Sequence, residues 1–339
     1  MWGGQDYRLA SRDNRSGSDT FTFGYGGYQE ARGNDGNTMC GSTATLCSCS
    51  ICVDTNSCAV PGRYNGEKYY VSGILEELDV PGEWYHDVLE RKLYYFPVSA
   101  STPDTTFDAS TEVVAAQLST VIRVGGAAGG ADPAVSGLWS PPAAGIVLEG
   151  LTITETRMTT LDRYEVPSGG DWAVARLAAL VLENAEDITV KRCVFDQVGG
   201  NAVLLSNHVA NSTIEDCEFD HMGDSGVVSL GSAHCESPKS SEACAPRETS
   251  RRCLALTPHW RLLMRAGTYG IEPTFPIGNT VARNSFKDVG IFGKQVSCYF
   301  QALTARASFV NNTCYRGPRA GINFNVSRRE DLLCELRVI

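Results

Sequence analysis

A sequence repeat between Ile188 and Leu230 restricts the possible folds of this chain more than any other feature. When the segment is aligned with itself at an offset of 24 residues, apolar, acidic and glycine positions coincide. The coincident pairs are Cys193 and Cys217, Phe195 and Phe219, Asp196 and Asp220, Val198 and Met222, Gly199 and Gly223, and Val203 and Val227. A period in the low twenties with short alternating apolar runs is typical of a solenoid, in which each repeat stacks on the next.

Two further copies of the repeat follow. One begins at Asn279 and places Asn284, Phe286, Val289 and Gly290 in the matching positions, and a looser one places Asn311 and Gly317 there. Short β-branched and aromatic runs broken by Gly and Asn are typical of strands and turns, and the helical segment of leucine-rich repeats is missing. We therefore predict an all-β fold, a single-stranded parallel β-helix.

Stacked coils lie about 4.8 Å apart, so equivalent residues form columns. Three phenylalanines are expected to form one internal aromatic stack: Phe195, Phe219 and Phe286. Three glycines mark turns and are expected to have positive φ angles: Gly199, Gly223 and Gly290. A further column is expected to contain Cys193, Cys217, Asn284 and Asn311. Its two cysteines are close enough for a disulfide, and two buried thiols are an equal alternative.

The rest of the chain divides into regions of different composition. We expect an irregular Cys-rich N-terminal region (1–62), a β-hairpin with a connecting region (63–144), the β-helix (145–325) and an off-pattern, helix-like tail (326–339). The β-helix is interrupted by a long loop insertion at about 232–277. The hairpin is predicted from two strand-like runs, Glu83–His86 and Lys92–Phe96. In the Cys-rich region, disulfides are favoured over zinc because the Cys49-x-x-Cys52 pair lacks a second ligand pair.

Charge and cysteine content restrict the partners. A formal net charge of −10 and a pI near 5.1 argue against a nucleic-acid partner. No run of apolar residues is long enough for a membrane span, and no signal peptide is visible. The 13 cysteines and the sequons at Asn14, Asn211, Asn311 and Asn325 nevertheless predict a secreted or cell-surface protein. We expect a monomer.

Two segments resemble known proteins. The segment Tyr64–Pro97, with LEELDVPGEWYHD followed by KLYYFP, resembles carbohydrate-active proteins with right-handed parallel β-helix repeats, and so does the run from Asp288 to Asn325. The fold implied is that of the pectin-lyase-like type, as in pectate lyases, polygalacturonases and related glycoside hydrolases. Such proteins continue with further coils where this chain turns into VSRREDLLCELRVI, so we expect both ends of the chain to be incomplete.

Glycoside hydrolysis needs two carboxylates, and columns of stacked coils can present them. We expect Asp220 and Asp288 to be the acid and the base or nucleophile, with Asp224 beside them and Asp196 in the column of Asp220. Residues expected to bind sugar are His221, which shares a column with Asp288, Lys294, Arg319, Asn323 and His208. Aromatic residues that could stack on sugar rings are Tyr299, Tyr315, Trp260 and Phe292.

Three functions therefore compete. The first is a glycoside hydrolase that acts on a polysaccharide or oligosaccharide without a cofactor or metal. The second is a polysaccharide lyase, for which Asp196, Asp220 and Asp224 could bind calcium; the few basic residues expected on the coil face, Lys294, Arg316 and Arg319, lower this alternative. The third is a non-catalytic glycan-binding or cell-surface repeat protein.

Overall fold

The structure is a computed structural model that describes residues 6–13, 20–26, 71–97, 111–125, 141–165, 172–231, 275–325 and 336–338. The chain forms two compact units, one from Met1–Cys58 together with Ala116–Ile339 and the other from Ala59–Ala115. Within the described residues no helix is both long and apolar enough to cross a membrane. The Cys-rich cluster and most of the insertion at 232–277 lie outside the described residues.

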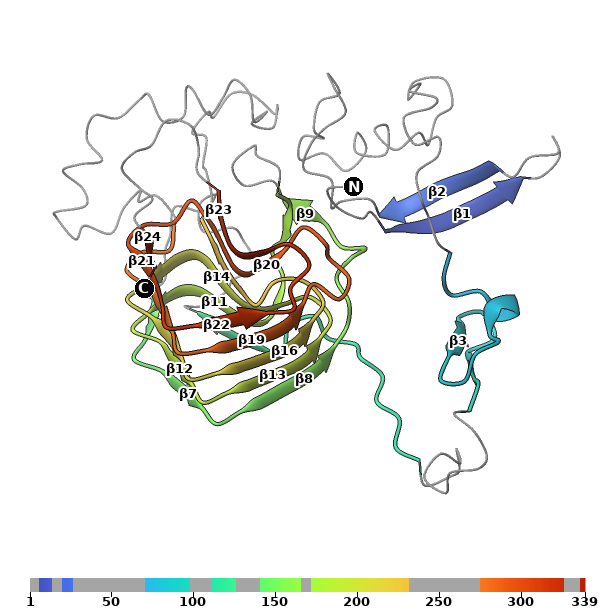
Figure 1. The fold of residues 1–339 in the computed structure, drawn as a ribbon, viewed down its shortest axis with the longest axis horizontal. Helices are drawn as coiled ribbons and strands as arrows, with labels where there is room; N and C mark the ends of the chain where they lie inside the picture. The colour runs from blue at the N-terminus through green and yellow to red at the C-terminus, as the bar shows by residue number, and fades with distance from the viewer. Residues whose placement is uncertain are drawn as a thin grey trace, which may run out of the picture. The chain divides into compact units, whose positions relative to one another are not determined.

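The first unit contains three parallel sheets, which Figure 1 shows stacked as successive coils. Sheet 1 consists of β7 (Val147–Glu149), β12 (Thr189–Lys191), β15 (Thr213–Glu215), β18 (Thr280–Ala282), β21 (Ala307–Val310) and β24 (Leu336–Val338). Sheet 2 consists of β8 (Thr152–Thr156), β13 (Val194–Val198), β16 (Glu218–Met222), β19 (Ser285–Val289) and β22 (Thr313–Tyr315). Sheet 3 consists of β5 (Ile122–Gly125), β11 (Ala178–Glu186), β14 (Asn201–Ala210), β17 (Val227–Leu230), β20 (Ser297–Ala302) and β23 (Ala320–Asn325), with β6 (Ala143–Ala144) beside β11. Each coil takes one strand from each sheet in turn, which confirms the parallel β-helix.

The predicted aromatic stack is present inside the coils. The backbone register pairs Phe195 with Phe219 and Phe219 with Phe286. The ring centroids lie 4.9 Å and 4.5 Å apart, the ring planes are nearly parallel, and none of the three side chains is more than 1% exposed. The offset of 24 residues is therefore the length of one coil.

The column of cysteines and asparagines lies at the corner between sheets 1 and 2. The side chain of each coil accepts a hydrogen bond from the backbone N–H of the preceding coil: Cys193 donates to the Cys217 sulfur, and Cys217 donates to Asn284 Oδ1. Asn284 donates in turn to Asn312 Oδ1, so the prediction of Asn311 in this column is wrong by one residue. Cys193 and Cys217 are free, buried thiols, and burial raises the pKa of Cys217 to about 12.

The prediction of positive φ at all three turn glycines is correct only for Gly290, whose φ is +77°. Gly199 and Gly223 are required for close packing instead. A Cβ on Gly199 would lie 2.3 Å from the backbone carbon of Arg157, and one on Gly223 would lie 2.2 Å from the carbonyl oxygen of Gly199. The glycines of successive coils thus approach each other too closely for any side chain.

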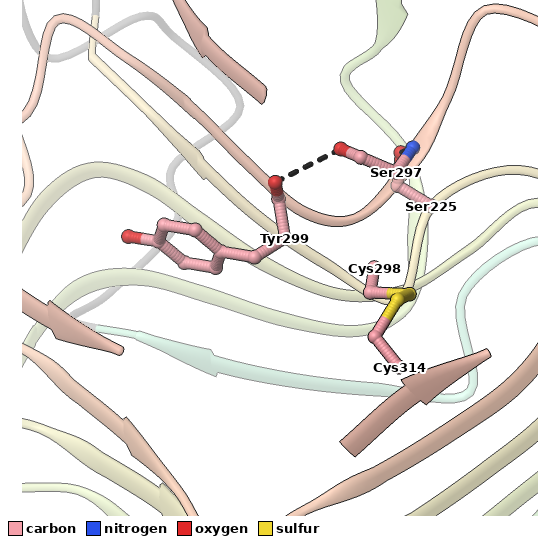
Figure 2. Close-up of a disulfide and its surroundings, with 5 residues drawn as sticks. All are labelled: Ser225, Ser297, Cys298, Tyr299 and Cys314. Carbon is pink, nitrogen blue, oxygen red and sulfur yellow. Dashed lines mark hydrogen bonds between the residues drawn. A yellow bond between two sulfur atoms is a disulfide. The ribbon is translucent and has the colours of Figure 1, made fainter. Parts of the chain in front are cut away.

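A disulfide replaces the aromatic stack in the last coils. Cys314 follows Phe286 in the register, and it is bonded to Cys298, which is fully buried on β20 (Figure 2). Figure 2 also shows Ser297 donating a hydrogen bond to the carbonyl oxygen of Tyr299, at 2.9 Å. The register places Cys298 in a column of small residues that faces the phenylalanine stack: Ala179, Ala202, Gly226 and Gly321. Where the phenylalanine is lost, two sulfur atoms fill the interior.

This column predicts that Gly226→Ala destabilises the β-helix by about 1–3 kcal/mol, because overpacking of a filled core costs that much. The new Cβ would lie 2.5 Å from the ring of Phe286, which has stacked neighbours and cannot move away. Gly321→Ala is the matched control, since its Cβ would meet only the Cys314 sulfur at 3.5 Å. Urea denaturation of both variants measures the difference, and equal stabilities would contradict the packing.

Short antiparallel pairs complete the described structure. The predicted hairpin is formed by β3 (Trp84–Asp87) and β4 (Lys92–Tyr95), which belong to the second unit. In the first unit β1 (Tyr7–Asp13) pairs with β2 (Thr20–Gly26), and β9 (Tyr164–Glu165) pairs with β10 (Val174–Ala175). Two ends of the coil extend beyond the sequence pattern: β5 precedes the expected start at Gly145, and β24 continues sheet 1 where a helix-like tail was expected.

Candidate functional site

The outer face of sheet 2 brings charged residues from successive coils into two columns. In the first column the register pairs Asp196 with Asp220, Asp220 with Lys287, and Lys287 with Tyr315. The next residue of each strand forms the second column, Gln197, His221, Asp288 and Arg316. Because inward positions are filled by the phenylalanine stack, these side chains are left on the outside. We refer to the eight residues as the sheet 2 face.

The second column has an unusual backbone. Gln197, His221, Asp288 and Arg316 all have φ angles between +51° and +57°, in the left-handed region. Such residues are uncommon outside glycine, and in a strand they redirect the side chain locally. The repetition of this conformation in every coil keeps His221 and Asp288 aligned with the residues above and below them.

The structure brings Asp220, His221 and Asp288 together, as the sequence predicts. His221 Nδ1 lies 2.8 Å from Asp220 Oδ1, and His221 Nε2 lies 3.7 Å from Asp288 Oδ2. The imidazole therefore lies between the two carboxylates. Asp196 Oδ1 is 4.0 Å from His221 Nδ1, and no lysine or arginine of the described chain lies within ion-pair distance of Asp196.

Two cations neutralise the remaining carboxylates. Arg316 donates to both oxygens of Asp288, with Nε 2.7 Å from Oδ1, and these hydrogen bonds lower the pKa of Asp288 below its usual value. Lys287 Nζ lies 2.5 Å from Asp220 Oδ2, and the hydrogen bond raises the pKa of Lys287. Asp288 is consequently ionised at neutral pH and suited to the role of a base or nucleophile.

One group on this face has the donor atoms of a metal site. An oxygen of Asp196, an oxygen of Asp220 and a nitrogen of His221 all lie within 4.8 Å of one another. Calcium prefers six to eight oxygen ligands, whereas this group offers a nitrogen and few oxygens. A mixed set of nitrogen and carboxylate ligands suits a transition metal better.

Asp224 lies apart from the sheet 2 face, at the corner between sheets 2 and 3. Its side chain is 1% exposed, and Oδ2 accepts hydrogen bonds from Tyr164 Oη at 2.6 Å and from Thr159 Oγ1 at 3.3 Å. Its other oxygen, Oδ1, has no hydrogen-bond partner and faces Gly293, where a Cβ would lie 2.2 Å away. The backbone of Phe292 and Gly293 closes over this corner by hydrogen bonds to Gly223.

Burial raises the pKa of Asp224 to about 6, although the hydrogen bonds from Tyr164 and Thr159 oppose the shift. Asp6 contributes to the same environment. Burial also raises the pKa of Asp6, against a hydrogen bond from Thr160 and the charge of Lys294. Asp224 is thus a carboxyl group that changes protonation near neutral pH, but it is enclosed by protein atoms.

Asp224→Asn is expected to become more stable relative to the wild type as the pH rises from about 4 to 7. The raised pKa means that the folded state binds a proton in this interval while the unfolded state does not, so the contribution of Asp224 to stability is lost as the pH rises through about 6. A shift from 3.8 to about 6 corresponds to about 3 kcal/mol. Urea denaturation at several pH values measures the change.

The matched control is Asp216→Asn, because hydrogen bonds from Arg283 lower the pKa of Asp216. Its pH dependence should have the opposite sign, since the ion pair is lost as the pH falls. A constant difference between Asp224→Asn and the wild type across this range would contradict the assignment.

The residues predicted to bind sugar are dispersed. Lys294 donates to the carbonyl oxygens of Gly290 and Ile291 in its own turn, at 2.8 Å each. Arg319 lies over the ring of Trp172, with 4.8 Å between its guanidinium carbon and the ring centroid. His208 and Asn323 are on sheet 3, where His208 Nε2 lies 2.7 Å from Glu186 Oε1. Among these, His221 alone belongs to the sheet 2 face.

The aromatic residues divide in the same way. Tyr299 is fully buried inside the coils, and Trp260 lies outside the described residues. Tyr315 is 43% exposed at the end of the first column, and Phe292 is 44% exposed in the turn after β19. Tyr315 and Phe292 therefore remain as surfaces on which a sugar ring could stack.

Sequence reasoning missed two kinds of residue. Lys287 was not considered, although it occupies the column of Asp220 in the copy that starts at Asn279, and its alignment with that aspartate was the signal. Tyr164 and Thr159 lie in the excursion between β8 and β11, where no repeat pattern exists to place them against Asp224. No sequence signal identified that contact.

Comparisons with known proteins support the fold. No protein-family model matches the chain, and a search of curated proteins finds no match. A search of solved structures finds a similar chain described as "Glycoside hydrolase", with a TM-score of 0.53 and 19% sequence identity. The similarity covers 92% of this chain and 49% of the other, so the chain spans about half the length of that structure. At this level of identity, what is shared is the fold.

Proposed function

We propose that this protein is a secreted glycoside hydrolase that acts on a polysaccharide bound along the sheet 2 face. The observation that carries the proposal is the set of solvent-exposed carboxylates on successive coils of an open sheet, with His221 between Asp220 and Asp288. A polymer that lies parallel to the coil axis would contact several coils at once. The fold is similar to that of a solved structure named as a glycoside hydrolase, which supports the substrate class.

The roles follow from the electrostatics. Asp288, held ionised by Arg316, is the base that takes a proton from water or the nucleophile that attacks the anomeric carbon. Asp220, in contact with His221, delivers the proton to the glycosidic oxygen as the bond from that oxygen to the anomeric carbon breaks. Asp196 and Tyr315 lie in the column of Asp220 and contact sugars on either side of the cleaved bond.

Secretion is supported by the Cys298–Cys314 disulfide, since disulfides persist mainly in oxidising compartments. The acidic net charge favours neutral polysaccharides over strongly anionic ones. No part of the catalytic proposal requires a metal or a cofactor.

Release of reducing ends from a panel of soluble and insoluble polysaccharides tests the proposal. We expect at least one neutral polysaccharide to be cleaved, and cleavage should persist in the presence of a chelator. Retention of a polysaccharide on the protein without product would instead support a non-catalytic glycan-binding protein and would overturn the enzymatic proposal.

A polysaccharide lyase is the second candidate, favoured by the basic residues Lys287 and Arg316 among the carboxylates. A lyase uses a basic side chain to remove a proton beside a uronate carboxylate, and a bound cation neutralises that carboxylate. Asp196 and Asp220 could hold the cation. Ultraviolet absorbance from an unsaturated product, abolished by a chelator, would establish the lyase in place of the hydrolase.

A further inference from the structure

Two asparagines of the β-helix differ from all others in the described part of the chain. Asn211 and Asn311 are exposed, and neither side-chain amide makes a hydrogen bond to a described residue. The other asparagines with described side chains are buried or partly buried: Asn184, Asn201, Asn207, Asn279, Asn284, Asn312 and Asn323. Asn279, Asn284 and Asn312 donate to backbone carbonyl oxygens of neighbouring coils.

Both exposed asparagines begin an N-x-T sequon. Asn211 is followed by Ser212 and Thr213, and Asn311 is followed by Asn312 and Thr313. The Asn-x-Ser/Thr sequence is the acceptor for N-linked glycosylation in the secretory pathway, provided that x is not proline. The exposed asparagines and the sequons therefore coincide in the β-helix.

The backbone conformation of the corners does not explain these asparagines. Asn211 and Asn311 have φ angles of +51° and +55°, and asparagine tolerates this left-handed region better than most residues. The equivalent corner before sheet 1 nevertheless carries Gly145, Asp187, Gly278 and Arg306 in other coils, all with positive φ. The corner before sheet 2 carries Gly150, Arg192, Asp216 and Arg283, again with positive φ. The fold accepts many residues at either corner, so asparagine is not dictated by the backbone.

The hydroxyl positions give a second argument at Asn311. Thr313 is exposed, and its column contains Glu218 and Ser285 in the preceding coils, so a threonine is not required by packing there. The side chain of Asn312, by contrast, is held by the hydrogen-bonded corner column. Asn311 and Thr313 thus project outward on either side of a residue that is fixed in the structure.

We propose that Asn211 and Asn311 carry N-linked glycans. Asn211 precedes β15 and Asn311 follows β21, so the glycans lie at opposite ends of sheet 1 strands and border the outer face of that sheet. Their attachment sites are separate from the carboxylates of the sheet 2 face, and the proposal does not depend on hydrolysis. Removal of the glycans should leave turnover on a soluble substrate unchanged.

The test is peptide mapping of the full-length chain, expressed behind a cleavable secretory leader in eukaryotic cells. The purified protein is treated with peptide N-glycosidase in ¹⁸O-labelled water, which converts each glycosylated asparagine to a labelled aspartate. We expect the label at positions 211 and 311. Protein retained inside the cell is mapped in the same way, so secretion is not a condition of the result.

Paired variants separate the sequon from the asparagine itself. Thr313→Val should abolish the label at Asn311, whereas Thr313→Ser should keep it, and Thr213→Val and Thr213→Ser should behave likewise at Asn211. Unlabelled asparagine at position 311 in the wild type would overturn the proposal for that site, and unlabelled asparagine at position 211 would overturn it for the other. A label that persists in a valine variant would also contradict it.

Discussion

Asp220→Asn is expected to reduce the release of reducing sugar at least about 100-fold, because proton transfer by a positioned side chain contributes that much or more. The substitution keeps the shape of the side chain but removes the proton that the carboxyl group gives up. It also removes the negative charge that Lys287 contacts at 2.5 Å and that lies beside His221. Initial rates on the best substrate of the polysaccharide panel measure the effect.

Stability should change little in this variant. The side chain of Asp220 is 32% exposed, and ion pairs of exposed side chains contribute about 0–1 kcal/mol. The thermal midpoint of Asp220→Asn should therefore stay close to that of the wild type. A large fall in the midpoint would mean that lost activity reports unfolding, and Asp288→Asn would then have to supply the kinetic evidence.

Asp216→Asn provides a matched control for activity. Asp216 is also paired with a basic residue of the following coil, Arg283, at 2.8 Å, but it lies at the corner between sheets 1 and 2. The same chemical change should leave turnover unaffected there. Unchanged turnover in Asp220→Asn would exclude this aspartate from the mechanism, and equal losses in both variants would show a general electrostatic effect.

The repeat predicted the sheet 2 face correctly because its coils keep a constant length. Phe195 and Phe219 are 24 residues apart and lie one above the other, so Asp196 and Asp220 must do the same. The alignment also holds across the long insertion, since Phe286 anchors the following coil. In the last coil Cys314 replaces the phenylalanine, and without that anchor the alignment slipped from Asn312 to Asn311.

Side-chain partners could not be predicted from the same pattern. The repeat states which residues lie one above the other, but it does not state which neighbour a charged group selects. Asp288 was expected to act with Asp220, whereas its two oxygens are bound by Arg316 of the next coil. Asp224 was expected beside these carboxylates, yet the turn that begins at Gly223 carries it into a buried corner under Phe292 and Gly293.

Phe219→Ala should destabilise the β-helix by about 3–5 kcal/mol, the usual cost of truncating a buried phenylalanine. Its ring is 1% exposed and stacked between Phe195 at 4.9 Å and Phe286 at 4.5 Å, so the loss would leave a cavity with an aromatic wall on each side. The backbone on both sides is held in parallel ladders and cannot collapse into this space. Urea denaturation followed by far-ultraviolet circular dichroism measures the change.

Phe292→Ala is the control for this experiment, since the ring of Phe292 is 44% exposed and its truncation should change stability by at most about 0.5 kcal/mol. A solenoid is held together mainly by contacts between neighbouring coils. Phe219→Ala interrupts the stack in its middle, so the unfolding transition should become broader or divide into two as well as move to lower urea. A single transition with the wild-type midpoint would show that Phe219 does not support the coils on either side, and the columns of the sheet 2 face would lose their structural basis.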